Sequence, residues 1–63
     1  MKLTDYDSAT KVSEQTYVVR WGKVWRVWAI DDLGDGAVTG PPFPTKLAAA
    51  AYALRKVERG DYR

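Results

Sequence analysis

Binding chemistry in this 63-residue chain has to come from aromatic and basic side chains, because the sequence contains no histidine and no cysteine. Those residue types supply many of the bases, nucleophiles and zinc ligands of proteins. Of the eight carboxylates, the one cluster is Asp31, Asp32 and Asp35 in an expected solvated turn, where nothing in the sequence predicts a raised pKa. We therefore expect no catalytic residues, no enzyme activity, no metal site and no cofactor.

The densest acidic cluster is the run Asp31-Asp32-Leu33-Gly34-Asp35-Gly36. It resembles the start of a calcium loop, but an EF-hand pattern beginning at Asp31 would place Leu33 and Pro42 where oxygen ligands are needed. A turn is the better interpretation, since aspartate and glycine are typical turn residues.

Aromatic and basic residues gather instead between Thr16 and Ile30, a stretch that holds all three tryptophans. Its β-branched and aromatic residues favour two strands, and glycine at the first position of the Gly22-Lys23 loop suits a type II′ hairpin turn. In this register one face carries Val18, Arg20, Trp25, Val27 and Ala29. The other carries Tyr17, Val19, Trp21, Val24, Arg26, Trp28 and Ile30. Both faces are apolar, and a single helix can cover only one.

The remaining elements must position this hairpin. Residues 37–39 predict a short edge strand, because Gly40-Pro41-Pro42 cannot continue to donate to a ladder. The segment 41–44 is more typical of a connector than of a polyproline ligand. Residues 1–15 show no clear period and are interpreted as a flexible arm, with a short strand over residues 2–6 as an alternative.

The clearest helix is predicted over residues 46–59, with Thr45 as N-cap and Gly60 as the stop. Its buried stripe is expected to be Leu47, Ala50, Ala51, Leu54 and Val57, with Tyr52, Arg55 and Arg59 on the outward flank. The sequence thus predicts an α+β fold in which a three-stranded antiparallel sheet packs on one C-terminal helix. Residues 16–63 would form a single sheet-plus-helix domain.

Charge and hydropathy indicate which partners and which cellular location to expect. The net charge is +2, with +3 on residues 16–30 and +3 on residues 45–63. These two basic segments are a weak electrostatic signal for binding a polyanion. No apolar run approaches the roughly 20 residues of a membrane span, and the N-terminus lacks the apolar centre of a signal peptide. We expect a soluble, cytoplasmic protein with no membrane partner.

Several strings resemble a known family: Tyr17 to Val27, the following Asp/Gly turn, Phe43-Pro44-Thr45-Lys46 at the helix start, and residues 57–62. Over residues 16–63 the chain is similar to the N-terminal arm-site DNA-binding domain of phage-type tyrosine integrases. The resemblance implies that Trp25 and Val27 face the helix and that the outer sheet face enters the major groove of double-stranded DNA. Because the chain ends at Arg63, we expect no recombinase activity.

Two functions follow. The first is a small non-catalytic DNA-binding module of a phage or mobile element, with Arg26, Lys23 and Lys46 as the DNA contacts. The second is a protein-interaction module, such as a phage-encoded modulator of a host protein or a homodimer. That module would use the aromatic side chains typical of interface hot spots, here Tyr17, Trp21 and Trp28 around Arg26.

Overall fold

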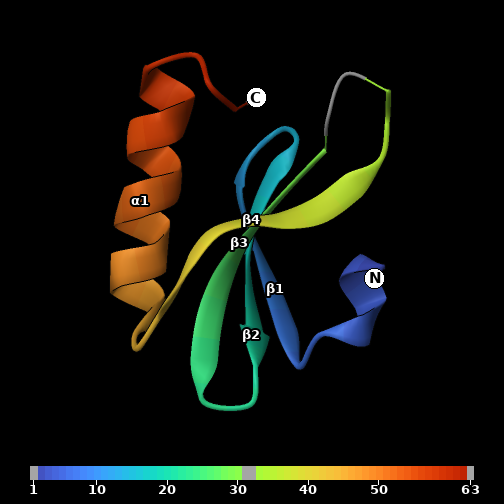
Figure 1. Cartoon of the computed structure of the whole chain (residues 1–63), viewed down its shortest axis with the longest axis vertical. Helices are drawn as coiled ribbons and strands as arrows, with labels where there is room; N and C mark the ends of the chain where they lie inside the picture. The colour runs from blue at the N-terminus through green and yellow to red at the C-terminus, as the bar shows by residue number, and fades with distance from the viewer. Residues whose placement is uncertain (1, 31–32, 63) are drawn as a thin grey trace.

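The computed structural model describes residues 2–30 and 33–62, and Figure 1 shows a twisted antiparallel sheet with one helix along its side. The elements in chain order are η1 (Leu3–Asp5), β1 (Ser8–Ser13), β2 (Thr16–Trp21), β3 (Val24–Ile30), β4 (Gly36–Phe43) and α1 (Lys46–Glu58). The predicted α+β architecture, an antiparallel sheet on a C-terminal helix, is confirmed. The predicted turn at Asp31 and Asp32 lies outside the described residues.

The central hairpin has the predicted register. Tyr17 pairs with Trp28, Val18 with Val27, Val19 with Arg26, Arg20 with Trp25 and Trp21 with Val24. Gly22 has φ +63°, and among the described residues only glycines have a positive φ, so Lys23 does not. That combination is the one a type II′ turn requires, and its twist matches that of the two strands.

The sheet has four strands, in the order β1-β2-β3-β4, so the prediction of three was wrong. β1 lies in the segment interpreted as an arm and pairs with β2, with a register shift between Lys11 and Ser13. It is an edge strand of mostly small and polar residues, which gives it a weak apolar period. The alternative strand over residues 2–6 is also wrong, because η1 occupies that segment. Whether the arm is flexible in solution stays a prediction.

β4 is the other edge strand, as predicted, but it is longer than residues 37–39. It continues to Phe43, which pairs with Trp25, and a register shift between Trp25 and Val27 absorbs the extra residues. In Figure 1 the strand crosses the sheet and then turns towards the start of α1.

The helix begins as predicted, with the Thr45 hydroxyl accepting a hydrogen bond from the Ala48 amide at 3.2 Å. Its predicted buried stripe was wrong: Ala49 and Ala53 are fully buried, whereas Leu47, Ala51 and Leu54 are exposed. Tyr52 was also misplaced, since its ring packs against the core rather than on the outward flank.

The core explains this rotation of the helix. Val18 and Val27 project from the sheet against Ala49 and Ala53, and Trp25, Phe43 and Tyr52 pack around them. Bulk comes from the sheet, so the helix approaches it most closely through its smallest side chains. This contact places Trp25 and Val27 on the helix side of the sheet, as the resemblance implied.

Candidate ligand-binding pocket

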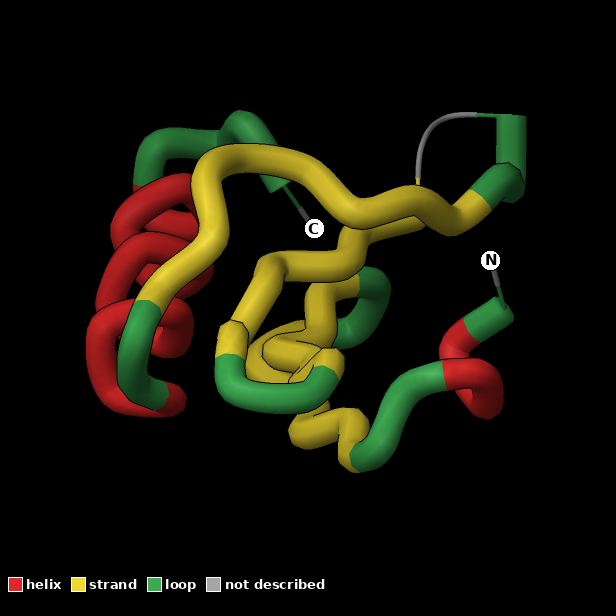
Figure 2. Tube along the Cα trace, turned by 60° about the horizontal axis from the view of Figure 1, so that its bottom comes forward, coloured by secondary structure: helices red, strands yellow, loops and turns green. Residues whose placement is uncertain are grey.

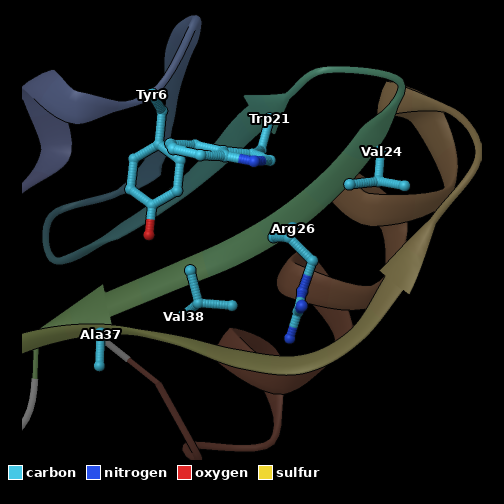
Figure 3. A pocket seen from close by; sticks show the side chains of 6 residues that line it. All are labelled: Tyr6, Trp21, Val24, Arg26, Ala37 and Val38. Atoms are coloured by element: carbon cyan, nitrogen blue, oxygen red, sulfur yellow. The ribbon is translucent and has the colours of Figure 1, made fainter. Parts of the chain in front are cut away.

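A pocket of about 380 Å³ opens on the side of the sheet away from the helix. Figures 1 and 2 show η1 and α1 on opposite sides of the sheet, and Figure 3 shows the pocket between the η1 segment and β4. Its lining combines two aromatic rings, three aliphatic side chains and one guanidinium, supplied by Tyr6, Trp21, Val24, Arg26, Ala37 and Val38. The site is therefore an apolar surface with a single positive charge.

The aromatic end is built from the segment that precedes β1. Tyr6 meets Trp21 edge to face, with ring centroids 5.8 Å apart and an interplanar angle of 77°. Edge-to-face contact is a favourable geometry for aromatic pairs. Trp21 nevertheless remains 51% exposed, so about half of the residue's surface is open to a ligand.

Asp7 fixes Tyr6 in this position. Its Oδ2 accepts a hydrogen bond from the Gly22 amide at 2.7 Å and lies 3.8 Å from the Arg20 guanidinium. The Asp7 amide in turn donates to the Arg20 carbonyl at 2.9 Å. The chain before β1 is thus tied to the tip of the central hairpin, next to Trp21.

Arg26 supplies the charge. Its Nη2 donates to the Gly40 carbonyl at 2.8 Å, and its Nε is buried without a hydrogen-bond partner. Within residues 2–30 and 33–62, no carboxylate forms an ion pair with this guanidinium. A half-buried charge whose Nε has no hydrogen-bond partner carries a desolvation cost, so an anionic or carbonyl group of a ligand would be favourable here.

The other predicted aromatic anchors lie outside the pocket. Trp28 is only 8% exposed, and its ring lies over Gly36 of β4. Tyr17 packs edge to face on that ring, with centroids 5.8 Å apart. Of the proposed protein-interface residues, the structure brings only Trp21 and Arg26 into the pocket. The indole Nε1 of Trp28 is buried without a hydrogen-bond partner.

The three predicted DNA contacts are distributed over the molecule. Arg26 lies in the pocket, Lys23 is exposed in the turn beside it, and Lys46 is the exposed first residue of α1, which packs on the opposite face of the sheet. Lys23 and Arg26 therefore both belong to the central hairpin, and Lys46 belongs to the helix layer.

Sequence reasoning missed Tyr6 and Val38. Tyr6 lies in a segment whose apolar residues follow neither a helical nor a strand period. The only feature of the sequence that could have indicated its role was an aromatic ring among polar residues. Val38 was placed in a strand, but its face depended on the pairing of β4 with β3, in which it lies opposite Trp28.

A tyrosine cluster lies on the helix side of the sheet. The Tyr62 hydroxyl is 3.2 Å from the Thr39 hydroxyl, and the ammonium of Lys56 is 5.5 Å from the Tyr52 ring centroid. A hydrogen bond with Tyr62 is the main cause that raises the pKa of Tyr52, and burial and nearby negative charge add to it. The cluster ties the segment after α1 to β4, which gives it a structural role.

The part of the chain that the structure describes contains no group of three side chains suited to hold a metal ion. Nor does it contain a helix long and apolar enough to cross a membrane. No protein-family model matches this chain, and neither curated proteins nor solved structures show a significant match to it.

Proposed function

We propose that this chain is a protein-binding module that receives a segment of a partner protein in the pocket beneath Tyr6 and Trp21. The observation that carries the proposal is the exposed face of Trp21, held beside a half-buried arginine that has no carboxylate partner among residues 2–30 and 33–62. Tryptophan and arginine are the residue types that most often dominate binding energy at interfaces.

The lining defines the chemistry of the segment. Val24, Ala37 and Val38 form an apolar surface suited to an aliphatic or aromatic side chain. Arg26 at the same surface favours a carboxylate a residue or two away, because guanidinium–carboxylate hydrogen bonds are strong and directional. The expected ligand is an extended segment in which an apolar residue lies next to an acidic one.

Selection from a library of random displayed peptides, followed by titration of tryptophan fluorescence, tests this proposal. Enriched peptides should combine apolar and acidic residues, and Trp21→Ala should weaken their binding about 30-fold, which corresponds to the roughly 2 kcal/mol of a hot-spot residue. Leu54→Ala is the matched control, because Leu54 is 47% exposed but lies on α1. Peptides that bind the wild type and Trp21→Ala equally would refute the proposal.

DNA binding is the second candidate, because Lys23 and Arg26 both lie on the central hairpin and Arg26 has no counter-charge within the described residues. A protein that neutralises phosphates binds more weakly as salt rises, with the logarithm of affinity falling linearly with the logarithm of salt concentration. Fluorescence anisotropy with a labelled duplex at two salt concentrations would reveal this dependence. Lys23→Gln should then weaken DNA binding and leave peptide binding nearly unchanged.

The geometry favours the protein ligand over DNA. The Arg26 guanidinium already donates to the Gly40 carbonyl, and the surface around it is aromatic and aliphatic. Phosphate contacts usually come from exposed lysine and arginine side chains distributed along the binding surface. Lys46, the third predicted contact, extends from the helix layer rather than from this face.

A further inference from the structure

Arg26 is the one charged side chain among the six described residues that line the pocket, and its neighbours hold it in place. Figure 3 shows the side chain extending towards β4, where Nη2 donates to the Gly40 carbonyl at 2.8 Å. Gly40 in turn packs closely against α1, since its φ is +78° and a Cβ built on it would lie 2.8 Å from Cε1 of Tyr52. The guanidinium is therefore oriented before a ligand arrives, which reduces the entropy lost on binding.

The pocket is small for a site that receives a peptide. Its volume of about 380 Å³ lies near the lower end of the range of roughly 300–1,000 Å³ for clefts that bind small ligands. Aliphatic side chains and the guanidinium share this space. The pocket therefore suits one apolar side chain together with the groups on its own Cα, rather than several residues of a segment.

A residue in the middle of a chain does not readily bring both an apolar side chain and a carboxylate into such a space. In an extended segment successive side chains point to opposite faces, so an acidic neighbour of the bound residue points away from the sheet. The next side chain on the same face lies roughly 7 Å further along. A C-terminal residue, in contrast, carries its side chain and its α-carboxylate on the same Cα.

We propose that the pocket binds the C-terminal residue of a partner protein, with an apolar side chain against Trp21 and Val24 and the α-carboxylate at Arg26. The inference rests on the proposed function and narrows its ligand, because the negative charge comes from the chain end rather than from an acidic side chain. Trp21 and Val24 lie directly opposite each other in the central hairpin, so they form one apolar surface beside Arg26. An α-carboxyl group has a pKa of about 3.5 and is ionised at neutral pH.

The carboxylate of the segment that carries Tyr6 does not take the place of this ligand. Asp7 accepts the hydrogen bond from the Gly22 amide at 2.7 Å and lies 3.8 Å from the Arg20 guanidinium. Its charge is balanced at the hairpin tip, and Arg26 has no ion pair within residues 2–30 and 33–62. Hydrogen bonds between a guanidinium and a carboxylate are strong and directional, so a chain end would gain most of its affinity at Arg26.

Two displayed peptide libraries test the proposal. One library places random residues at a free C-terminus, and the other places them inside a chain that continues into a fixed glycine–serine tail. The free-end library should give the tighter binders, with an aliphatic or aromatic last residue. The selected sequences are then synthesised with a free carboxylate or with a C-terminal amide. In fluorescence anisotropy of peptides labelled at the N-terminus, the amide should bind at least about 10-fold more weakly.

Two variants separate the charge from the apolar contact. Arg26→Gln removes the charge, so the acid and the amide should bind it with nearly equal affinity. Trp21→Ala should weaken both forms by about the same factor and keep the preference for the acid, because the ring contacts the side chain of the ligand. The amide peptide reports whether Arg26→Gln leaves the pocket intact, and the comparison of acid with amide on the wild type needs no variant.

Failure of this inference is distinguishable from failure of the proposed function. Equal binding of acid and amide to the wild type, or a preference for the acid that survives Arg26→Gln, would overturn the inference. Internal peptides that bind as tightly as free ends would also overturn it and would leave the protein-binding module standing. N-acetyl-leucine that binds as tightly as the selected peptides would assign the pocket to small apolar acids instead. The absence of binders from both libraries would refute the proposed function as well.

Discussion

The contact between Trp28 and Gly36 gives the sharpest test of the fold, because it decides whether Trp28 is a structural residue or a free anchor. A Cβ built on Gly36 would lie 2.7 Å from Cε2 of the Trp28 ring, with Cζ2 and Cη2 closer still. Real Cβ atoms essentially never approach a heavy atom within 3.0 Å. Gly36→Ala must therefore displace an indole that is 8% exposed.

We expect Gly36→Ala to cost about 2–3 kcal/mol of folding free energy, as for an added methyl group in a packed interior. A domain of this length has about 3–9 kcal/mol in total, so the loss is a large fraction of its stability. At roughly 4–8 °C for each kcal/mol, the melting temperature should fall by about 10–20 °C. Thermal unfolding followed by circular dichroism measures this shift.

Two companion variants isolate the cause. Gly34→Ala adds the same methyl group where nothing lies within 4 Å, so only its φ of +85° opposes the change, at about 1 kcal/mol. Trp28→Phe removes the ring atoms nearest Gly36, so the double variant Trp28→Phe/Gly36→Ala should be at least about 1 kcal/mol more stable than additivity predicts. Gly36→Ala within about 0.5 kcal/mol of the wild type, or strict additivity, would refute the packing described for Trp28.

Three further changes test the elements around the pocket and the helix. Thr45→Ala removes the N-cap hydroxyl and should cost about 1 kcal/mol in urea unfolding, whereas Thr45→Ser should cost little. Asp7→Ala should release Tyr6 from Trp21 and weaken peptide binding in the fluorescence titration, while unfolding of the sheet changes by less than about 1 kcal/mol. The hydrogen bond with Tyr62 raises the pKa of Tyr52 in the folded protein. The stability it contributes is therefore complete below the unfolded-state pKa of about 10 and is lost as pH rises through the folded-state value. Tyr52→Phe should flatten this alkaline loss in unfolding midpoints measured against pH.

The central hairpin could be predicted from the sequence pair by pair, because a short-range signal fixes it. A two-residue loop with glycine first determines which residues face each other, and every pair then follows by counting. The Thr45 N-cap could also be predicted from a short-range signal. A hydroxyl side chain followed by a run of good helix formers marks the start of a helix within a few residues.

The phase of the helix could not be predicted in the same way. Residues 48–51 are all alanine, so apolar spacing allowed two stripes, and the larger leucines favoured the wrong one. The deciding factor is tertiary: Val18 and Val27 already fill the space between the layers, so only alanine fits at the closest approach. A single sequence does not contain that volume constraint in a local pattern.

The pocket depended on long-range pairing for the same reason. Trp21 and Arg26 were placed on the correct face by the hairpin register, but Tyr6 reaches them only because Asp7 binds the hairpin turn 15 residues further along the chain. β1 was missed because its small and polar residues gain order from pairing with β2 rather than from an apolar period of their own.

The placement of bulk in the sheet decides which apolar side chains stay exposed on each side of the molecule. Because valine and tryptophan side chains fill the space beneath the helix, the leucines of α1 have no room there and lie on its outer side. On the other face, Trp28 takes the space over β4 and leaves Trp21 exposed at the hairpin tip. The pocket and the outer side of α1 share no residue and lie on opposite sides of the sheet, so substitutions at the two places should act independently. Peptide affinity should then be the same in the wild type and in Leu47→Gln/Leu54→Gln, whose replaced side chains are exposed, and a difference would refute the independence of the pocket from the outer side of α1.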